Sequence, residues 1–187
     1  MIINSFQKIF LYFFNIKMYQ DSNDINEIIP NLFISNWETS NNTNIINHYN
    51  IKAVITLTSF KKPENITNFY KNNNIDFLFI RIDDSPSENI YQYFDLTFSF
   101  IDKYISMNEN VLVHCMAGIS RSSTIILNYM LKKMYTYNTI KNLCPCKMVK
   151  TSLQIARHNR HFINPNEGFK MQLISKCLEY EKIYTNL

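Results

Sequence analysis

VLVHCMAGISRSS, residues 111–123, is the stretch of sequence that decides the fold of this chain. Three apolar residues lead into a loop, and a segment with helical spacing follows it. The loop carries Cys115 and Arg121, together with Gly118, one of only two glycines in 187 residues. A strand, a loop with a thiol and a guanidinium, and then a helix predict a phosphate cradle with a nucleophile at its base.

The loop has the composition that anion binding requires. It contains no proline, so each backbone N–H group is available to a bound anion, and Gly118 permits the backbone conformation that such a nest needs. The following helix adds its positive N-terminal end, and Arg121 offers a planar fork to two phosphoryl oxygens. These positive surroundings favour a nucleophilic thiolate at Cys115. Ser122 is expected to donate a hydrogen bond to that sulfur, and His114 is expected to order the loop.

Alternating strand and helix patterns extend to both sides of this loop. Strands are predicted at residues 31–34, 52–58, 76–82 and 111–114, and helices at 64–71, 90–107, 122–134 and from 169 onward. Because such alternation is typical of βαβ units, we expect an α/β fold with a central, mostly parallel sheet flanked by helices. The length of 187 residues, with 46% hydrophobic and 18% charged residues, is sufficient for one globular domain.

The first 20 residues carry a pattern of their own. Apolar side chains recur there at helical spacing, which predicts an extra, amphipathic N-terminal helix: Ile2, Phe6, Ile9, Phe10 and Phe13. The segment lacks the features of a secretory signal, and polar residues interrupt it well short of the ~20 apolar residues of a membrane span. A helix packed on its own domain and a helix on a membrane surface are alternatives. The large aromatic face favours a protein partner.

Charge and cysteine content restrict the partners and the compartment. A net charge of +4 suits an anionic substrate and is too small to indicate nucleic-acid binding. The four cysteines, at positions 115, 144, 146 and 177, do not form the pattern of a disulfide framework, so we expect a reducing, cytoplasmic environment. Cys144 and Cys146 lack a second pair of zinc ligands and are expected to be free thiols. A regulatory disulfide with Cys115 is a further hypothesis.

The residues HCMAGISRS, 114–122, match the H-C-x5-R-S/T signature of cysteine-dependent protein phosphatases, and their flanks resemble the dual-specificity subgroup. The resemblance extends to residues 29–34, to IDDSP at 82–86 and to NPNEGF at 164–169, and it implies a catalytic domain over residues 27–184. Residues 139–150 look like an insertion. Poxviral members look most similar, and in that group an N-terminal helix is exchanged between two subunits. The resemblance therefore implies a homodimer formed through residues 1–20, in a host cytoplasm or a virion.

The resemblance also implies a two-step reaction that needs no metal or other cofactor. Cys115 attacks the phosphorus of phosphotyrosine or of phosphoserine and phosphothreonine while a carboxylic acid protonates the leaving oxygen, and water then hydrolyses the phosphocysteine. The implied catalytic residues are Cys115, Arg121, Asp84 and Ser122. The residues expected to bind the phosphate are Met116, Ala117, Gly118, Ile119, Ser120 and Arg121.

The acid is either Asp83 or Asp84. Adjacent side chains on an extended segment point to opposite faces, so only one of the two is expected to face the loop. Spacing alone does not choose between them. In the family the acid directly precedes a small polar residue, which favours Asp84 before Ser85. Asp83 is then expected to be a solvated carboxylate.

The side chains inside the loop narrow the substrate class. They carry no positive charge, whereas phosphatases that act on polyphosphoinositides or RNA 5′ ends usually add basic residues there. This favours a single phosphate on a protein side chain. An enzyme for those non-protein phosphates and a non-catalytic module that binds phosphoproteins are the alternatives.

A basic cluster lies further along the chain. It consists of Arg157, His158, Arg160 and His161, and it either binds a second phosphate or is a solvated helix end.

Overall fold

The computed structural model describes residues 24–137 and 143–184. Five strands form one sheet in the order β1-β2-β5-β3-β4. Their bounds are Ile25–Ile29 (β1), Leu32–Ser35 (β2), Ile51–Thr58 (β3), Asp76–Arg81 (β4) and Asn110–His114 (β5). The β1 strand pairs with β2 in antiparallel fashion, and the other three pairs are parallel. The prediction of an α/β fold with a mostly parallel sheet is confirmed.

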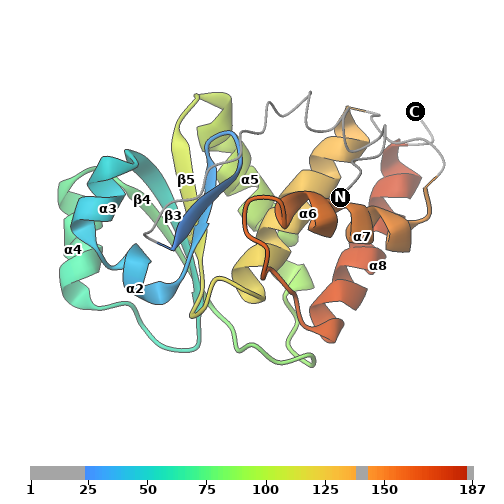
Figure 1. Ribbon diagram of the computed structural model, residues 1–187, viewed down its shortest axis with the longest axis horizontal. Helices are drawn as coiled ribbons and strands as arrows, with labels where there is room; N and C mark the ends of the chain where they lie inside the picture. Colours follow the sequence, from blue (N-terminus) through green and yellow to red (C-terminus); the bar gives the residue numbers. More distant parts are fainter. Residues whose placement is uncertain (1–23, 138–142, 185–187) are drawn as a thin grey trace.

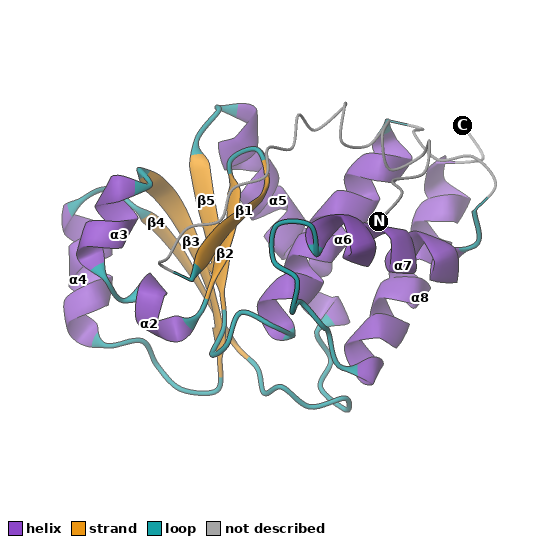
Figure 2. Cartoon of the chain, viewed as in Figure 1, coloured by secondary structure: helices purple, strands orange, loops and turns teal. Residues whose placement is uncertain are grey.

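Helices cover both faces of this sheet (Figures 1 and 2). On one face lie α2 (Trp37–Ser40), α3 (Thr43–His48) and α4 (Glu64–Asn72). The opposite side carries α5 (Phe94–Ser106), α6 (Arg121–Thr136), α7 (Pro145–Ala156) and α8 (Glu167–Tyr184). A short 3-10 helix, η1 (Tyr91–Tyr93), leads into α5. None of the described helices is long and apolar enough to cross a membrane.

The β5 strand lies at the centre of the sheet and is buried on both faces. Val111 and Val113 belong to the larger core, under α5, α6 and α8, whereas Leu112 points to the smaller core beneath α3 and α4. A strand buried on both faces is apolar at every position rather than at alternate ones, which is why this part of the sequence is an unbroken apolar run. The loop with Cys115 therefore starts from the central, buried strand of the sheet.

The structure departs from the expected elements in three places. It contains β1, α2 and α3, which the sequence patterns did not predict, and the helix expected from residue 90 begins as η1. The α2 and α3 helices have four and six residues, too few for apolar periodicity, and the side chains of Asn36 and Asn42 cap them. The helix expected over residues 1–20 lies outside the described residues.

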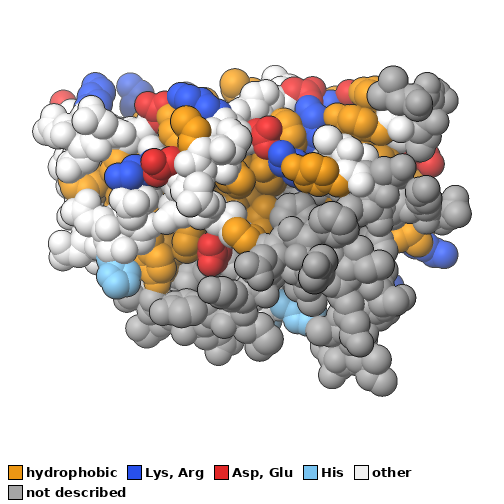
Figure 3. Space-filling model, turned by 90° about the horizontal axis from the view of Figure 1, so that it is seen from above, with side chains coloured by type: hydrophobic (Ala, Val, Ile, Leu, Met, Phe, Trp, Pro, Cys, Tyr) orange, Lys and Arg blue, Asp and Glu red, His pale blue; other side chains and the backbone are white. Residues whose placement is uncertain are grey.

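The face seen in Figure 3 carries a mixed surface. Among the described residues on that face, Lys and Arg side chains alternate with Asp and Glu and with hydrophobic patches. Basic side chains are interspersed there rather than gathered into one large positive patch.

Candidate active site

Every carbonyl oxygen of the loop between β5 and α6, residues 115–120, accepts a hydrogen bond from a neighbouring group. In order along the loop, the donors are His114 Nδ1, Trp37 N, Arg160 Nη2, Arg160 Nε, Asn164 N and Thr124 N, at 2.9–3.3 Å. Within the described residues, no backbone N–H group from Met116 to Arg121 donates to a protein acceptor. Because the carbonyls are held by the protein, the N–H groups remain available to an anion.

The thiol of Cys115 lies at the start of this loop. The residue is 1% exposed, and its Sγ lies 3.2 Å from the Oγ of Ser122, in the first turn of α6. The positive end of α6 therefore faces the sulfur, and the Ser122 hydroxyl lies within hydrogen-bond distance of it. The structure brings these two sequence-predicted residues together.

The guanidinium of Arg121 is buried and only partly paired. Its Nη1 donates to the carbonyl oxygen of Ile82 at 3.1 Å, which fixes the side chain against the segment that follows β4. Its Nε lies 3.6 Å from Asp84 Oδ2 and has no hydrogen-bond partner among the described residues. A buried donor without a partner is costly, so this nitrogen is suited to an oxygen of a bound phosphate.

The carboxylate of Asp84 is held beside the loop by two hydrogen bonds. Ser120 Oγ donates to Asp84 Oδ1 at 2.7 Å, and Asn166 Nδ2 donates to the same oxygen at 2.9 Å. The neighbouring Asp83 is exposed and has no hydrogen bond or ion pair within the described parts of the chain. Of the two candidate acids, Asp84 is thus the one that contacts the loop.

Asn166 is a residue that sequence reasoning missed. Its backbone N–H donates to Ser120 Oγ at 3.1 Å, and its Oδ1 caps α8 by accepting from Phe169 N at 2.9 Å. Through its side chain and its backbone N–H, this one residue joins the candidate acid, the loop and the start of α8. The NPNEGF motif carries the signal for it, because an Asn directly before the first residue of a helix is a typical N-cap.

One member of the basic cluster, Arg160, departs from both expectations, whereas Arg157 and His158 are half-buried and His161 is exposed. Arg160 is 1% exposed, so it belongs neither to a solvated helix end nor to an accessible second phosphate site. Its guanidinium donates to the carbonyls of Ala117 and Gly118, and it pairs with Asp24 at 2.8 Å. Burial lowers the pKa of Arg160, and the charge of Asp24 opposes that effect. Arg160 therefore holds the loop in place from the side of the protein core.

The α8 helix holds the segment that follows Asp84. Gly168 lies so close that an added Cβ would meet Pro86 O at 1.9 Å. One turn further along, the amide of Gln172 donates to Glu88 O at 2.8 Å and accepts from Tyr91 N at 2.9 Å. Both backbone partners lie between Asp84 and α5, so this acid-bearing segment is fixed to the C-terminal helix.

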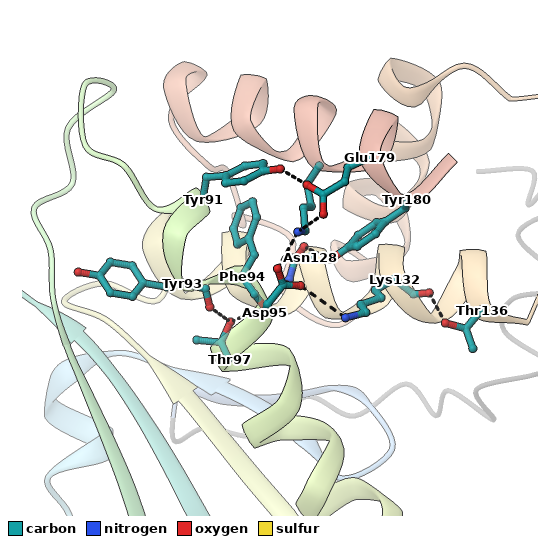
Figure 4. A network of polar contacts seen from close by, with 11 residues as sticks. Tyr91, Tyr93, Phe94, Asp95, Thr97, Asn128, Lys132, Thr136, Glu179 and Tyr180 are labelled. Atoms are coloured by element: carbon teal, nitrogen blue, oxygen red, sulfur yellow. Dashed lines mark hydrogen bonds and ion pairs between the residues drawn. The ribbon is translucent and has the colours of Figure 1, made fainter. Parts of the chain in front are cut away.

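A network of charged and phenolic groups extends this attachment (Figure 4). Tyr91 donates to Glu179, and Lys176 contacts both Glu179 and Asp95 at 2.8 Å. Burial opposes the charge of Lys176, but hydrogen bonds to the two carboxylates outweigh it and raise the pKa of this lysine. The network ties η1 and the start of α5 to α8.

The remaining predicted residues occupy different positions around the loop. Met116 and Ala117 are exposed, Ile119 is half-buried, and the side chain of Ser120 is engaged with Asp84. Gly118 has a φ of +66°, and a Cβ there would meet Arg160 Nη2 and Ser35 O at 2.6 Å. Backbone N–H groups, rather than side chains, are therefore what most of this loop offers to a ligand.

The other cysteines lie apart from the loop. Cys144 and Cys146 are exposed at the N-terminus of α7, with their sulfur atoms 2.8 Å apart. Within the described residues, no contact joins either of them to Cys115. No group of three or more His, Cys, Asp or Glu side chains is arranged there to hold a metal ion.

The chain is similar to known proteins in both sequence and fold. The family described as "Dual specificity phosphatase, catalytic domain" matches residues 32–179. Tyrosine-protein phosphatase yvh1 of Schizosaccharomyces pombe is 34% identical over 83% of this chain and 42% of its own length. Dual specificity protein phosphatase 1B of Arabidopsis thaliana is 31% identical over 89% of this chain and 87% of its own length. The chain thus spans less than half of the yeast protein and most of the plant protein.

Two solved structures have a similar fold. The Yvh1 phosphatase domain from Chaetomium thermophilum has a TM-score of 0.71 and 28% identity, covering 81% of this chain and 94% of that one. The human tyrosine phosphatase-like serine/threonine/tyrosine-interacting protein has a TM-score of 0.66 and 29% identity, covering 87% of this chain and 99% of that one.

Proposed function

Because this chain belongs to the dual specificity phosphatase family, we propose that it hydrolyses phosphotyrosine and phosphoserine or phosphothreonine in proteins through a phosphocysteine intermediate. One observation carries the proposal. A buried thiol lies at the base of a loop whose carbonyls are all engaged, so that its N–H groups are free for a phosphate. We propose residues 27–184 as the catalytic domain.

The proposed reaction is the one that the family resemblance implies, and the contacts around Cys115 support it. Its sulfur attacks phosphorus while the P–O bond to the substrate breaks, and Asp84 gives its proton to the departing oxygen. The loop N–H groups and Arg121 stabilise the charge on the equatorial oxygens in both steps. A water molecule then attacks phosphorus and gives a proton to Asp84, and the sulfur leaves with the help of the Ser122 hydroxyl. The products are the free hydroxyl side chain and inorganic phosphate.

Matched peptides that carry phosphotyrosine or phosphothreonine test the substrate class. We expect hydrolysis of both, unaffected by a chelator, and much slower release of phosphate from a 5′-phosphorylated RNA and from a phosphoinositide, because the loop side chains carry no charge for a polyanion. The measurement is kcat/KM for each substrate. Faster hydrolysis of the RNA or the lipid would indicate that the natural substrate is a polyanion and not a phosphoprotein. Tight peptide binding without hydrolysis would instead indicate a binding module.

We further propose a homodimer formed through residues 1–20. The support for it is the aromatic amphipathic pattern of that segment and its resemblance to the exchanged helix of poxviral members. Multi-angle light scattering should give twice the mass of one chain for the full sequence and a single-chain mass after removal of residues 1–20. A single-chain mass for the full sequence at micromolar concentration would contradict the dimer.

The same resemblance is the basis for proposing a viral phosphatase that acts in the cytoplasm of a host cell. The requirement of Cys115 for a reducing environment supports this compartment, since an oxidised thiol is not a nucleophile.

A further inference from the structure

A buried lysine lies directly behind the loop. Lys62 is 7% exposed, and its Nζ lies 2.7 Å from His114 Nε2 and 3.1 Å from Ser40 Oγ. The rings of Trp37 and Tyr70 lie 4.9 and 5.7 Å from this ammonium. No ion pair joins Lys62 to a carboxylate in the parts of the chain that the structure describes. A lysine so deeply buried without an acid is rare, and it indicates a specific role.

The contacts of His114 determine where its ring carries a proton. His114 is fully buried, and burial together with the charge of Lys62 holds its pKa well below its usual range, so the ring is neutral. A lysine ammonium has only donors to offer, which makes Nε2 an acceptor. The single ring proton therefore lies on Nδ1, where it donates to the carbonyl oxygen of Cys115 at 3.3 Å. Thr56 Oγ1, 2.6 Å from Nε2, completes the environment of the ring.

This chain of contacts ends at the residue proposed to attack phosphorus. Because a peptide unit is planar and trans, holding the Cys115 carbonyl toward His114 points the N–H of Met116 the opposite way. The tautomer of His114 thus fixes the first N–H group of the loop as well as the peptide unit beside the thiol. The ammonium of Lys62, which only donates, and the carbonyl of Cys115, which only accepts, both select that tautomer, and Lys62 does so from the Nε2 side.

We propose that Lys62 is a positioning residue for Cys115, acting through the Nδ1–H tautomer of His114. The inference rests on the proposed role of Cys115 as the nucleophile. Burial lowers the pKa of Lys62 to about 7, so the ammonium that imposes the tautomer is present below that pH and is lost above it. The other groups around Lys62 do not change charge in this range, because burial raises the pKa of Tyr70 and Ser40 does not titrate.

The test compares Lys62→Met with Lys61→Met, which removes the same charge from the exposed neighbouring residue. The substrate is an aryl phosphate with an acidic leaving group, whose departure does not need Asp84. We expect Lys62→Met to lower kcat/KM at least about tenfold near pH 6, the factor for a lost hydrogen bond from a charged group. The deficit should shrink as pH rises through about 7, because the wild type then loses the same ammonium. Lys61→Met should match the wild type throughout.

The tautomer of His114 can also be measured directly by NMR, in an experiment that does not depend on catalytic turnover. In ¹⁵N-edited NMR of the wild-type protein at about pH 6, His114 should carry its proton on Nδ1, whereas Lys62→Met should shift the ring toward the Nε2–H form. Lys62→Arg, which keeps a charged donor, should retain the Nδ1–H form to higher pH. An Nε2–H ring in the wild type, or the same pH profile for Lys62→Met and Lys61→Met, would overturn the inference. Loss of all hydrolysis in the wild type would contradict the proposed function instead.

Discussion

Replacing Cys115 with serine should lower turnover on aryl phosphates and phosphopeptides by about 10⁴-fold or more, as removal of a catalytic nucleophile does in other enzymes. Serine is nearly isosteric and keeps the contact with Ser122, but its hydroxyl is not ionised near neutral pH and is a much weaker nucleophile than a thiolate. A factor of this size corresponds to about 5 kcal/mol in the activation free energy. The measurement is kcat under saturating substrate.

The matched control for this substitution is Cys177→Ser. Cys177 is the other buried cysteine, in α8, and burial raises the pKa of its thiol to about 12, so it is not a thiolate at neutral pH. We expect Cys177→Ser to keep kcat and Cys115→Ser to keep phosphopeptide binding, because the loop N–H groups and Arg121 remain. Wild-type turnover in Cys115→Ser would rule out this residue as the nucleophile.

Asp84→Asn should lower kcat on a phosphotyrosine peptide by about 10²–10³-fold, within the range for loss of a general acid. The asparagine amide retains an oxygen that accepts from Ser120 and Asn166, so the position of the side chain is preserved while the proton donor is lost. An aryl phosphate with an acidic leaving group should be spared, since that group departs without a proton. The measurement is the dependence of kcat on the pKa of the leaving group.

Asp83→Asn serves as the control for that experiment. It makes the same change of charge one residue earlier, on a side chain that is exposed and does not contact the loop within the described residues. It should behave like the wild type with every leaving group. If Asp83→Asn, and not Asp84→Asn, gave the leaving-group dependence, the assignment of the acid would be reversed.

The elements around Cys115 could be predicted because their signals are local. An apolar run, a loop and a helical pattern follow one another within residues 111–134, and the structure has β5, the loop and α6 there. The choice of Asp84 over Asp83 came from a resemblance, since two adjacent carboxylates look alike in a sequence. The contacts with Ser120 and Asn166 that distinguish Asp84 join residues 36 and 82 positions away, and spacing along the chain does not reveal them.

The supports of the loop were missed for a related reason. A sequence gives the charge of Arg160 and Lys62 but not their burial. Because basic residues are mostly exposed, both alternatives for the cluster with Arg160, a second phosphate site and a solvated helix end, assumed an accessible side chain. Both residues are buried because each forms hydrogen bonds to the loop region from the core side. Arg160 donates to the carbonyls of Ala117 and Gly118, and Lys62 donates to the ring of His114.

The close approach of Gly168 to Pro86 makes the position of the acid-bearing segment depend on the last helix. Through that contact and through Gln172, α8 carries the segment that bears Asp84. With 18 residues, α8 is about 27 Å long, and the buried side chains of Phe169, Leu173 and Tyr180 anchor it in the core. A side chain at position 168 overlaps the backbone of Pro86, so Gly168→Ala is expected to displace the acid-bearing segment and to impair proton donation without changing any catalytic group.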